Sequence, residues 1–128
     1  IVCFTKKFNK MQKLIAWVEI PTENFDRAVD FYNAILDLNL EKRDFGHEKM
    51  ACLPDDEGAI TYAEGYKPGK DGVLVSLQAG EGLDSMLQKI ENNGGSILQE
   101  KTKIESENRD YFAVFTDTEG NKLGLYGK

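Results

Sequence analysis

Two short acidic turns of nearly the same sequence divide this chain into halves that follow one plan. PDDEG occupies residues 54–58, and TDTEG occupies residues 116–120. Each turn lies between two short apolar segments, and an amphipathic segment precedes them in each half. An internal repeat constrains the fold more than any single segment, because both halves must form the same supersecondary unit. The repeat predicts an α+β fold with two βαβββ units in tandem.

The first strand of the first half is predicted from strict alternation over residues 16–20. Ala16, Val18 and Ile20 share one face, and Trp17 and Glu19 share the other. Alternation of this kind places one face on the core and the other toward water. A tryptophan on a solvated face therefore needs an explanation.

The other elements of the first half follow from a helix cap and three short runs. Asn24 is expected to cap a helix, because the apolar residues after it recur at spacings of three and four. That apolar stripe consists of Phe25, Ala28, Val29, Tyr32, Ile35 and Leu36. Strands are expected at residues 38–43, 49–53 and 59–64, with Gly58 free to adopt a positive φ in the turn.

The second half repeats this plan in the same order. A strand at residues 73–78 precedes a helical stripe of Leu83, Met86, Leu87 and Ile90. The sequence NNGG at residues 92–95 is expected to end that helix, since Asn and Gly tolerate the left-handed conformation. Strands are expected at residues 96–100, 111–116 and 122–126, and a polar loop is expected at about 102–109.

Length and charge favour one domain that binds neither nucleic acid nor membrane. The 128 residues suffice for a single core. The domain is expected at residues 13–128, with units at about 13–65 and 72–127, and residues 1–12 are interpreted as an N-terminal extension or an expression remnant. The formal net charge of −6 disfavours a nucleic-acid partner. No apolar run reaches the roughly 18 residues that span a bilayer.

The two cysteines, Cys3 and Cys52, form no CxxC pair. Cys52 lies in the apolar run MACLP, which favours a buried reduced thiol over a disulfide. Cysteine usage of this kind is typical of a cytoplasmic protein.

Two long motifs resemble the vicinal oxygen chelate superfamily of glyoxalases, bleomycin-resistance proteins and extradiol dioxygenases. VEIPTENFDRAVDFYNAILDLNLE resembles its first module, and FAVFTDTEGNKLGLY resembles its last hairpin. The nearest likeness is to the small bacterial type related to lactoylglutathione lyase. The resemblance implies that two βαβββ modules curl into a cupped mixed sheet, with helices outside and a pocket inside. It also implies a homodimer in which each pocket is completed by the partner.

Within such a cup, strand parity predicts the lining residues. Trp17 and Glu19 are expected to face the pocket. With Asp117–Gly120 as the last turn, Val114 is expected to pair with Leu123 on the helix side. Matching the two acidic turns adds Ile60, Tyr62 and Glu64 to the pocket side. The residues predicted to contact a small-molecule ligand are Trp17, Tyr62, Ser76, Gln78, Tyr111, Lys122 and Tyr126. Tyr111 and Tyr126 have an equal alternative role, as plugs of the sheet or contacts with a second subunit.

The resemblance also tests whether this chain can hold the metal ion of the superfamily. Metal-dependent members use His, Glu or Gln from four strands, because a divalent ion needs several converging lone pairs. Those positions correspond here to Trp17, a residue near Tyr62, Leu74 or Ser76, and Gly124. Indole and glycine cannot act as ligands, and the single histidine, His47, lies in a polar stretch. No metal and no other cofactor are therefore expected.

The pocket carboxylates leave two functions open. The first is a metal-free protein that binds a small organic molecule in the aromatic cup. The alternative is a glyoxalase-related lyase or isomerase that uses Glu19 or Glu64 as a base, since two converging carboxylates raise one pKa. Either glutamate is otherwise solvated or paired with a lysine such as Lys67 or Lys122.

Overall fold

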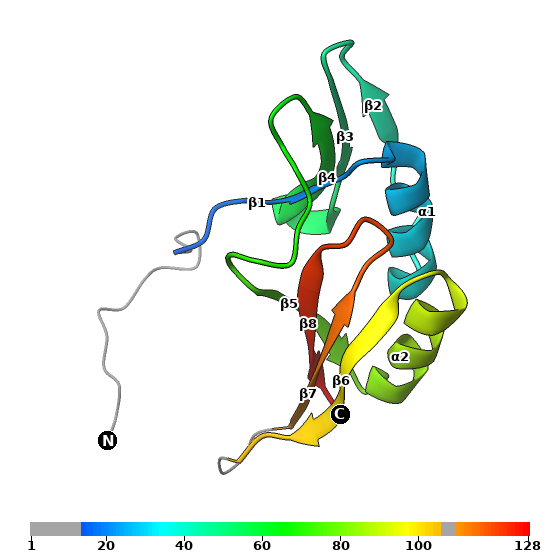
Figure 1. Ribbon diagram of the computed structural model, residues 1–128, viewed down its shortest axis with the longest axis vertical. Helices are drawn as coiled ribbons and strands as arrows, with labels where there is room; N and C mark the ends of the chain where they lie inside the picture. The colour runs from blue at the N-terminus through cyan, green and yellow to red at the C-terminus, as the bar shows by residue number, and fades with distance from the viewer. Residues whose placement is uncertain (1–13, 106–109) are drawn as a thin grey trace.

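The computed structural model describes residues 14–105 and 110–128 and contains two βαβββ units (Figure 1). The proposed extension, residues 1–12, lies outside the described residues, as does part of the loop expected near 102–109. The first unit comprises β1 (Val18–Pro21), α1 (Phe25–Leu36), β2 (Lys42–Asp44), β3 (Glu48–Cys52), η1 (Pro54–Asp56) and β4 (Gly58–Ala63). The second unit comprises β5 (Val75–Gly80), α2 (Leu83–Asn92), β6 (Ser96–Lys103), β7 (Tyr111–Thr116) and β8 (Lys122–Gly127).

Each unit forms a four-stranded mixed sheet of the same topology. The strand orders are β1-β4-β3-β2 and β5-β8-β7-β6. The first strand of each unit pairs in parallel with the last, and the other neighbours are antiparallel. The expected α+β fold with tandem βαβββ units is confirmed, and β1 and β5 lie at the edges of their sheets.

Both helices lie on one side of the two sheets and pack against each other (Figure 1). Their apolar stripes join the helix-facing residues of both sheets in one core. The side chain of Asn24 accepts a hydrogen bond from the Arg27 N–H at 3.0 Å, so the predicted cap of α1 is confirmed. The fully buried core includes Val29, Tyr32, Ile35, Ile60, Leu83, Ile90, Phe115 and Leu125.

The face assignment of the first strand is confirmed by the core. Ile20 is buried in the core, whereas Glu19 lies on the opposite side, which we call the open face of the sheet. Trp17 precedes β1, and its side chain remains 39% exposed. In the second unit, Leu77 pairs with Leu125 of the core, so Ser76 and Gln78 lie on the open face, as predicted.

The predicted register of the last hairpin was wrong by one residue. Val114 pairs with Gly124, and Phe115 is the residue that pairs with Leu123 in the core. The turn has five residues, because the N–H groups of Asp117 and Asn121 form hydrogen bonds across it. One residue of slip reverses every side chain of a strand. Tyr111 consequently lies on the helix side.

The same slip affects β4, because the two acidic turns are not structurally equivalent. Ile60 was expected on the open face, but it pairs with Ile20 and Ala51 in the core. Thr61 therefore occupies the open face, and Tyr62 lies on the helix side. The η1 segment gives this hairpin a loop of different length from that between β7 and β8.

Cys52 is a free thiol, but it is exposed, so the prediction of burial was wrong. It follows the buried Ala51 in β3, so its side chain points to the other face of the strand.

Among the described residues, neither helix is long and apolar enough to cross a membrane.

Candidate functional site

A groove runs along the seam between the two sheets. The edge strands β1 and β5 border this groove and do not pair with each other. Three cavities of about 180, 320 and 220 Å³ adjoin along it, since neighbouring cavities share lining residues. Val18, Ile20 and Val75 line both the first and the second cavity. We call this continuous depression the seam groove, and we call its 180 Å³ end the seam cavity.

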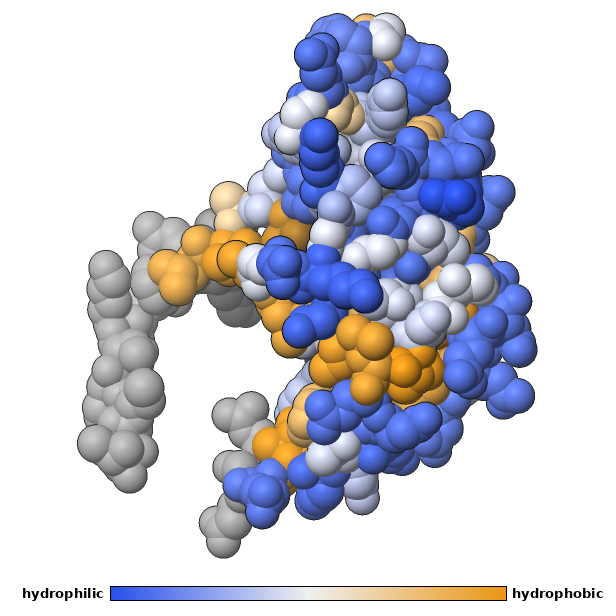
Figure 2. All heavy atoms as spheres, in the orientation of Figure 1, coloured by the Kyte–Doolittle hydropathy of each residue, from blue (hydrophilic) through white to orange (hydrophobic). Residues whose placement is uncertain are grey.

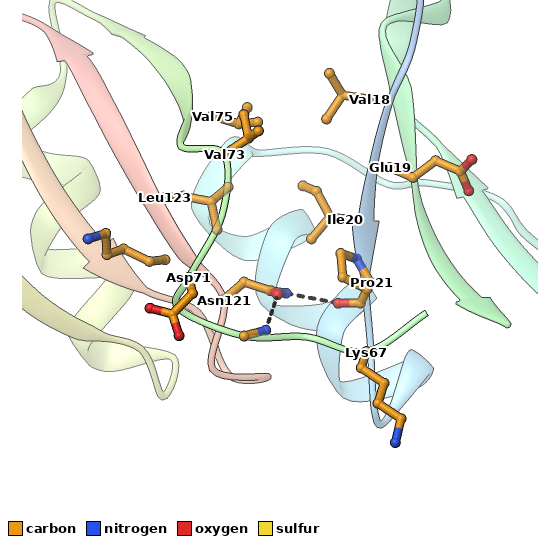
Figure 3. A pocket seen from close by; sticks show the side chains of 12 residues that line it. Val18, Glu19, Ile20, Pro21, Lys67, Asp71, Val73, Val75, Asn121 and Leu123 are labelled. Atoms are coloured by element: carbon orange, nitrogen blue, oxygen red, sulfur yellow. Dashed lines mark hydrogen bonds between the residues drawn. The ribbon is translucent and has the colours of Figure 1, made fainter. Parts of the chain in front are cut away.

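The seam cavity has an aliphatic interior (Figure 3). Val18 and Ile20 of β1 point across the gap toward the second unit, where Val73, Val75 and Leu123 lie. Val18, Ile20 and Val75 have helix-side parity on the two edge strands, so their side chains face the gap. The charged groups of the lining lie differently. Glu19, Lys67 and Asp71 direct their charged ends away from the centre (Figure 3).

Asn121 closes one end of the seam cavity, and its amide joins three segments. Its Nδ2 donates to the carbonyl oxygen of Pro21 at 2.8 Å, and its Oδ1 accepts from the Gly69 N–H at 3.0 Å. The same Nδ2 lies 3.0 Å from Oδ2 of Asp117. Asn121 thereby connects β1, the segment between the units and the turn before β8.

Asp117 is the centre of a buried polar network between the units. Its Oδ2 accepts a hydrogen bond of 2.6 Å from the hydroxyl of Tyr32 in α1. Its Oδ1 accepts from the N–H groups of Glu119 and Asn121 at 2.8 and 2.9 Å. Burial and the adjacent Asp117 carboxylate raise the pKa of Tyr32 well above its ordinary value, so the hydroxyl remains a donor.

Glu119 links the same turn to the start of α1. Its carboxylate is fully buried and accepts from the N–H groups of Glu23 and Asn24 at 2.8 and 2.7 Å. Arg27 donates through Nε at 2.7 Å and Nη2 at 3.1 Å. Burial alone would raise the pKa of Glu119, but the hydrogen bonds from Arg27, Asn24, Glu23 and Thr118 outweigh it and lower that pKa. We call these contacts the Glu119 clasp.

The open face contributes polar groups beside the seam groove. Glu19 lines the seam cavity, and its Oε1 accepts from the Thr61 hydroxyl at 2.8 Å. Lys122 also lines the seam cavity, whereas Ser76 and Gln78 line the adjoining 320 Å³ cavity. Four of the residues predicted for the site therefore lie along one groove.

The other predicted residues lie elsewhere. Tyr62 and Tyr111 are on the helix side, where lysine side chains approach their rings: Lys49 for Tyr62 and Lys101 and Lys103 for Tyr111. Tyr126 is on the open face and pairs with Phe112. None of these tyrosines lines the seam groove, and neither does Trp17.

Glu64 does not lie near Glu19, contrary to the expected convergence of the two carboxylates. Glu19 pairs with Ala59, and Glu64 follows β4 five positions further along the chain. At about 3.3 Å per residue, that displacement is roughly 16 Å. Only Glu19 is positioned at the seam groove.

The residues at the expected metal positions do not fit a divalent ion. Gly124 has no side chain, and the Ser76 hydroxyl occupies the space above it. Thr61, which takes the open-face position expected for Tyr62, contributes a hydroxyl that is already bonded to Glu19. Among residues 14–105 and 110–128, no three His, Cys, Asp or Glu side chains converge.

The sequence interpretation missed the helix-side valines of the seam cavity and the amide of Asn121. Val18 was assigned to the core face of its strand, and both Val18 and Val75 have core parity. They line a cavity because β1 and β5 are edge strands. Val18 and Val75 are 57 positions apart in the sequence, and no local pattern indicates how their two strands lie relative to each other. Asn121 follows the glycine of the second turn, whereas Ala59 follows the glycine of the first turn. This polar residue at the matching position was the available signal for Asn121.

Comparison with known proteins places the whole fold among proteins of one superfamily. The profile of the Glyoxalase/Bleomycin resistance protein/Dioxygenase superfamily matches residues 14–125. No curated protein matches the chain.

Solved structures share the fold at low sequence identity. A glyoxalase/bleomycin resistance protein from Albidiferax ferrireducens is 19% identical, with a TM-score of 0.64 over 91% of this chain and 99% of its own. The fosfomycin resistance protein FosX from Listeria monocytogenes is 13% identical, with a TM-score of 0.67 over 92% and 95%. A glyoxalase I mutant from Zea mays matches over 45% of its own length and 88% of this chain, with 20% identity and a TM-score of 0.61.

Proposed function

Because the chain belongs to the Glyoxalase/Bleomycin resistance protein/Dioxygenase superfamily, we propose that it binds a small organic molecule without the metal ion used by metal-dependent members. The observation that carries this proposal is the seam groove, where Glu19, Lys122, Ser76 and Gln78 surround an aliphatic interior. Ligand sites are typically concave and mostly apolar, with a few polar groups that fix orientation.

The donor chemistry supports the metal-free part of the proposal. The positions expected for the metal ligands correspond in this chain to Trp17, a residue near Tyr62, Leu74 or Ser76, and Gly124. Neither an indole nor a glycine supplies a lone pair, and neutral hydroxyls are weak ligands for Zn²⁺. Elemental analysis of purified protein should find no stoichiometric Zn, Ni, Fe or Mn. One tightly held ion per chain would contradict the proposal.

A panel of small organic molecules tests binding directly. A compound that binds only the folded state stabilises it by about 2.7 kcal/mol at a free concentration of 100 Kd, which a thermal melt detects. Trp17 is the only tryptophan and provides a fluorescence signal. Because Trp17 does not line the seam groove, Trp17→Ala should change the affinity less than twofold. A panel without a single saturable stabilisation would overturn the proposal.

We also propose a homodimer. Residues 14–17, directly before β1, extend away from the body on the side opposite the helices (Figure 1), and apolar atoms of this stretch lie at the surface (Figure 2). Leu14 is 84% exposed and Ile15 is 65% exposed. These residues adjoin the free edge of β1, which a second copy would cover. Light scattering at micromolar concentration should give twice the 14.4 kDa chain mass.

An enzymatic role is the alternative, and it rests on Glu19. Glu19 borders the seam cavity, and its carboxylate lies on the open face beside it, where the hydrogen bond from the Thr61 hydroxyl fixes its orientation as a base requires. Glu19→Gln should abolish any lyase or isomerase turnover but leave ligand affinity measurable.

We also propose a cytoplasmic location, which rests on the sparse cysteines of the chain.

A further inference from the structure

We propose that the seam cavity binds a compact apolar group, either a branched aliphatic group or a single six-membered ring, carried by a small organic molecule. This inference rests on the proposed function, which requires only that a small molecule binds along the seam groove. The inference adds that the apolar part of the ligand binds in the seam cavity, and it limits the size of that part.

The size limit comes from the volume of the cavity. The seam cavity measures about 180 Å³. A cavity of roughly 150 Å³ lined by Leu, Ile and Phe binds benzene. One ring or one branched chain therefore fits within the seam cavity, whereas a fused ring system would have to extend past Val18, Ile20 and Val75 into the adjoining cavity.

The chemical class follows from the lining. Five aliphatic side chains converge on the cavity, two from β1 and three from the second unit (Figure 3). Both polar atoms of the Asn121 side chain already have partners, and Glu19 points away toward Thr61. A buried hydroxyl or carboxylate would lose water without gaining a hydrogen bond at this end. The polar part of the ligand therefore remains at the mouth, near Lys67 and Asp71.

Val73 provides an independent indication. It lines the cavity, yet its side chain is 91% exposed, the highest value among the large apolar residues that the structure describes. It belongs to the segment between the units, which Gly69 attaches to Asn121. An apolar group in the cavity would shield Val73 from water, which is favourable in proportion to the apolar area covered.

Methyl NMR of the full chain tests the placement. Protein labelled at Ile, Leu and Val methyl groups is titrated with fluorobenzene, and with 1-fluoronaphthalene as an oversized probe. We expect fluorobenzene to cause saturable shifts at Val18, Ile20, Val73, Val75 and Leu123, with at least fivefold weaker binding of 1-fluoronaphthalene. Saturable shifts centred on Val114 of the open face would overturn this inference but leave small-molecule binding intact.

Two substitutions and a matched control complete the test. Val75→Phe fills the cavity and should weaken fluorobenzene at least tenfold. Leu98→Phe, at a half-exposed position of β6 outside the seam groove, should change its affinity less than twofold. Val73→Ser changes only an exposed side chain, so it decides the question even if Val75→Phe fails to fold. It should weaken fluorobenzene at least threefold. Unchanged affinity in Val73→Ser, or no saturable shift in the original chain, would overturn the inference, while the compound panel tests the proposed function separately.

Discussion

The turn between β7 and β8 packs against α1 of the other unit, whereas the turn between β3 and β4 is exposed to solvent. In the first, Asp117 and Asn121 are buried, and Glu119 completes the clasp on α1. In the second, the side chains of Asp55, Asp56 and Glu57 are all exposed, and the two aspartates have positive φ. Two turns of the pattern D-x-E-G thus have different surroundings.

The difference shows that a turn sequence specifies a reversal of the chain but not its contacts. Tyr32 and Arg27 lie across from the second turn and supply its hydrogen-bond partners. The repeat is therefore symmetric in topology and asymmetric in its polar contacts. The polar contacts of the second turn join the units beside the seam cavity, because Asn121 belongs to both the network and the cavity.

Asp117→Ala should have the largest effect on this asymmetry. It leaves the Tyr32 hydroxyl and the backbone N–H of Asn121 without their acceptor in a buried site, and each unsatisfied group costs about 1–3 kcal/mol. We expect the free energy of unfolding to fall by about 3–4 kcal/mol in urea denaturation. Asp55→Asn, at the matching position of the exposed turn, should cost less than about 1 kcal/mol, because asparagine also tolerates the positive φ there. Equal effects would mean that the two turns contribute alike.

Glu119→Ala should have the second largest effect. It removes the acceptor for two N–H groups at the start of α1 and for the Arg27 side chain. Losing a side-chain cap costs about 0.5–2 kcal/mol, so we expect a loss near 2 kcal/mol. Glu57→Ala is the matched control and should lie within about 0.5 kcal/mol of the original chain. A loss below that control value would show that the clasp does not stabilise the fold.

The pH dependence of stability should come in part from the same carboxylate. The pKa of Glu119 is lower in the folded chain than its ordinary value of 4.5. Its stabilising contribution is therefore complete above the unfolded-state pKa and is lost as the pH falls through the folded-state pKa. Urea midpoints measured from pH 6 downward should fall less steeply for Glu119→Gln than for the original chain.

Glu57→Gln is the matched control for that pH series. Its side chain is exposed on the other acidic turn. Its midpoints should follow those of the original chain at every pH. If both variants flatten the curve equally, the acid sensitivity belongs to general surface charge and not to the clasp.

Local patterns in the sequence predicted the helices and strands. They failed to predict the face of the sheet for side chains in hairpins where one residue of loop length changes the register. The Asn24 cap and the faces of β1 and β5 follow from short spacings, so they were predictable. Tyr62 and Tyr111 were placed on the wrong side, because the geometry of each turn sets the register of its hairpin. Aspartates 55 and 56 adopt a left-handed conformation that the sequence PDDEG does not reveal.

The candidate site was predicted only in part, for a reason of the same kind. Glu19 and Lys122 were identified by strand parity and do line the seam cavity. Its aliphatic interior was not identified, because Val18 and Val75 have the parity of core residues. Whether such residues are packed or line a cavity depends on how two edge strands lie relative to each other, which is a tertiary property.

The smallest expected effect concerns the start of α2, which lacks the side-chain cap that α1 has. Asn24 and the Glu119 clasp satisfy N–H groups of α1, whereas α2 follows Gly82 and has no side-chain cap. Gly82 has a φ of −112°, which any residue adopts, and an added Cβ would make only an ordinary contact of 3.6 Å with the Ala79 carbonyl oxygen. Gly82→Asp should therefore stabilise the chain by a few tenths of a kcal/mol, since aspartate caps slightly better than glycine and favours the helix dipole. Gly82→Ala is the control, because alanine adds the Cβ without an acceptor. Equal urea midpoints for the two variants would show that α2 gains nothing from a cap, and that the difference between the two helix starts does not limit stability.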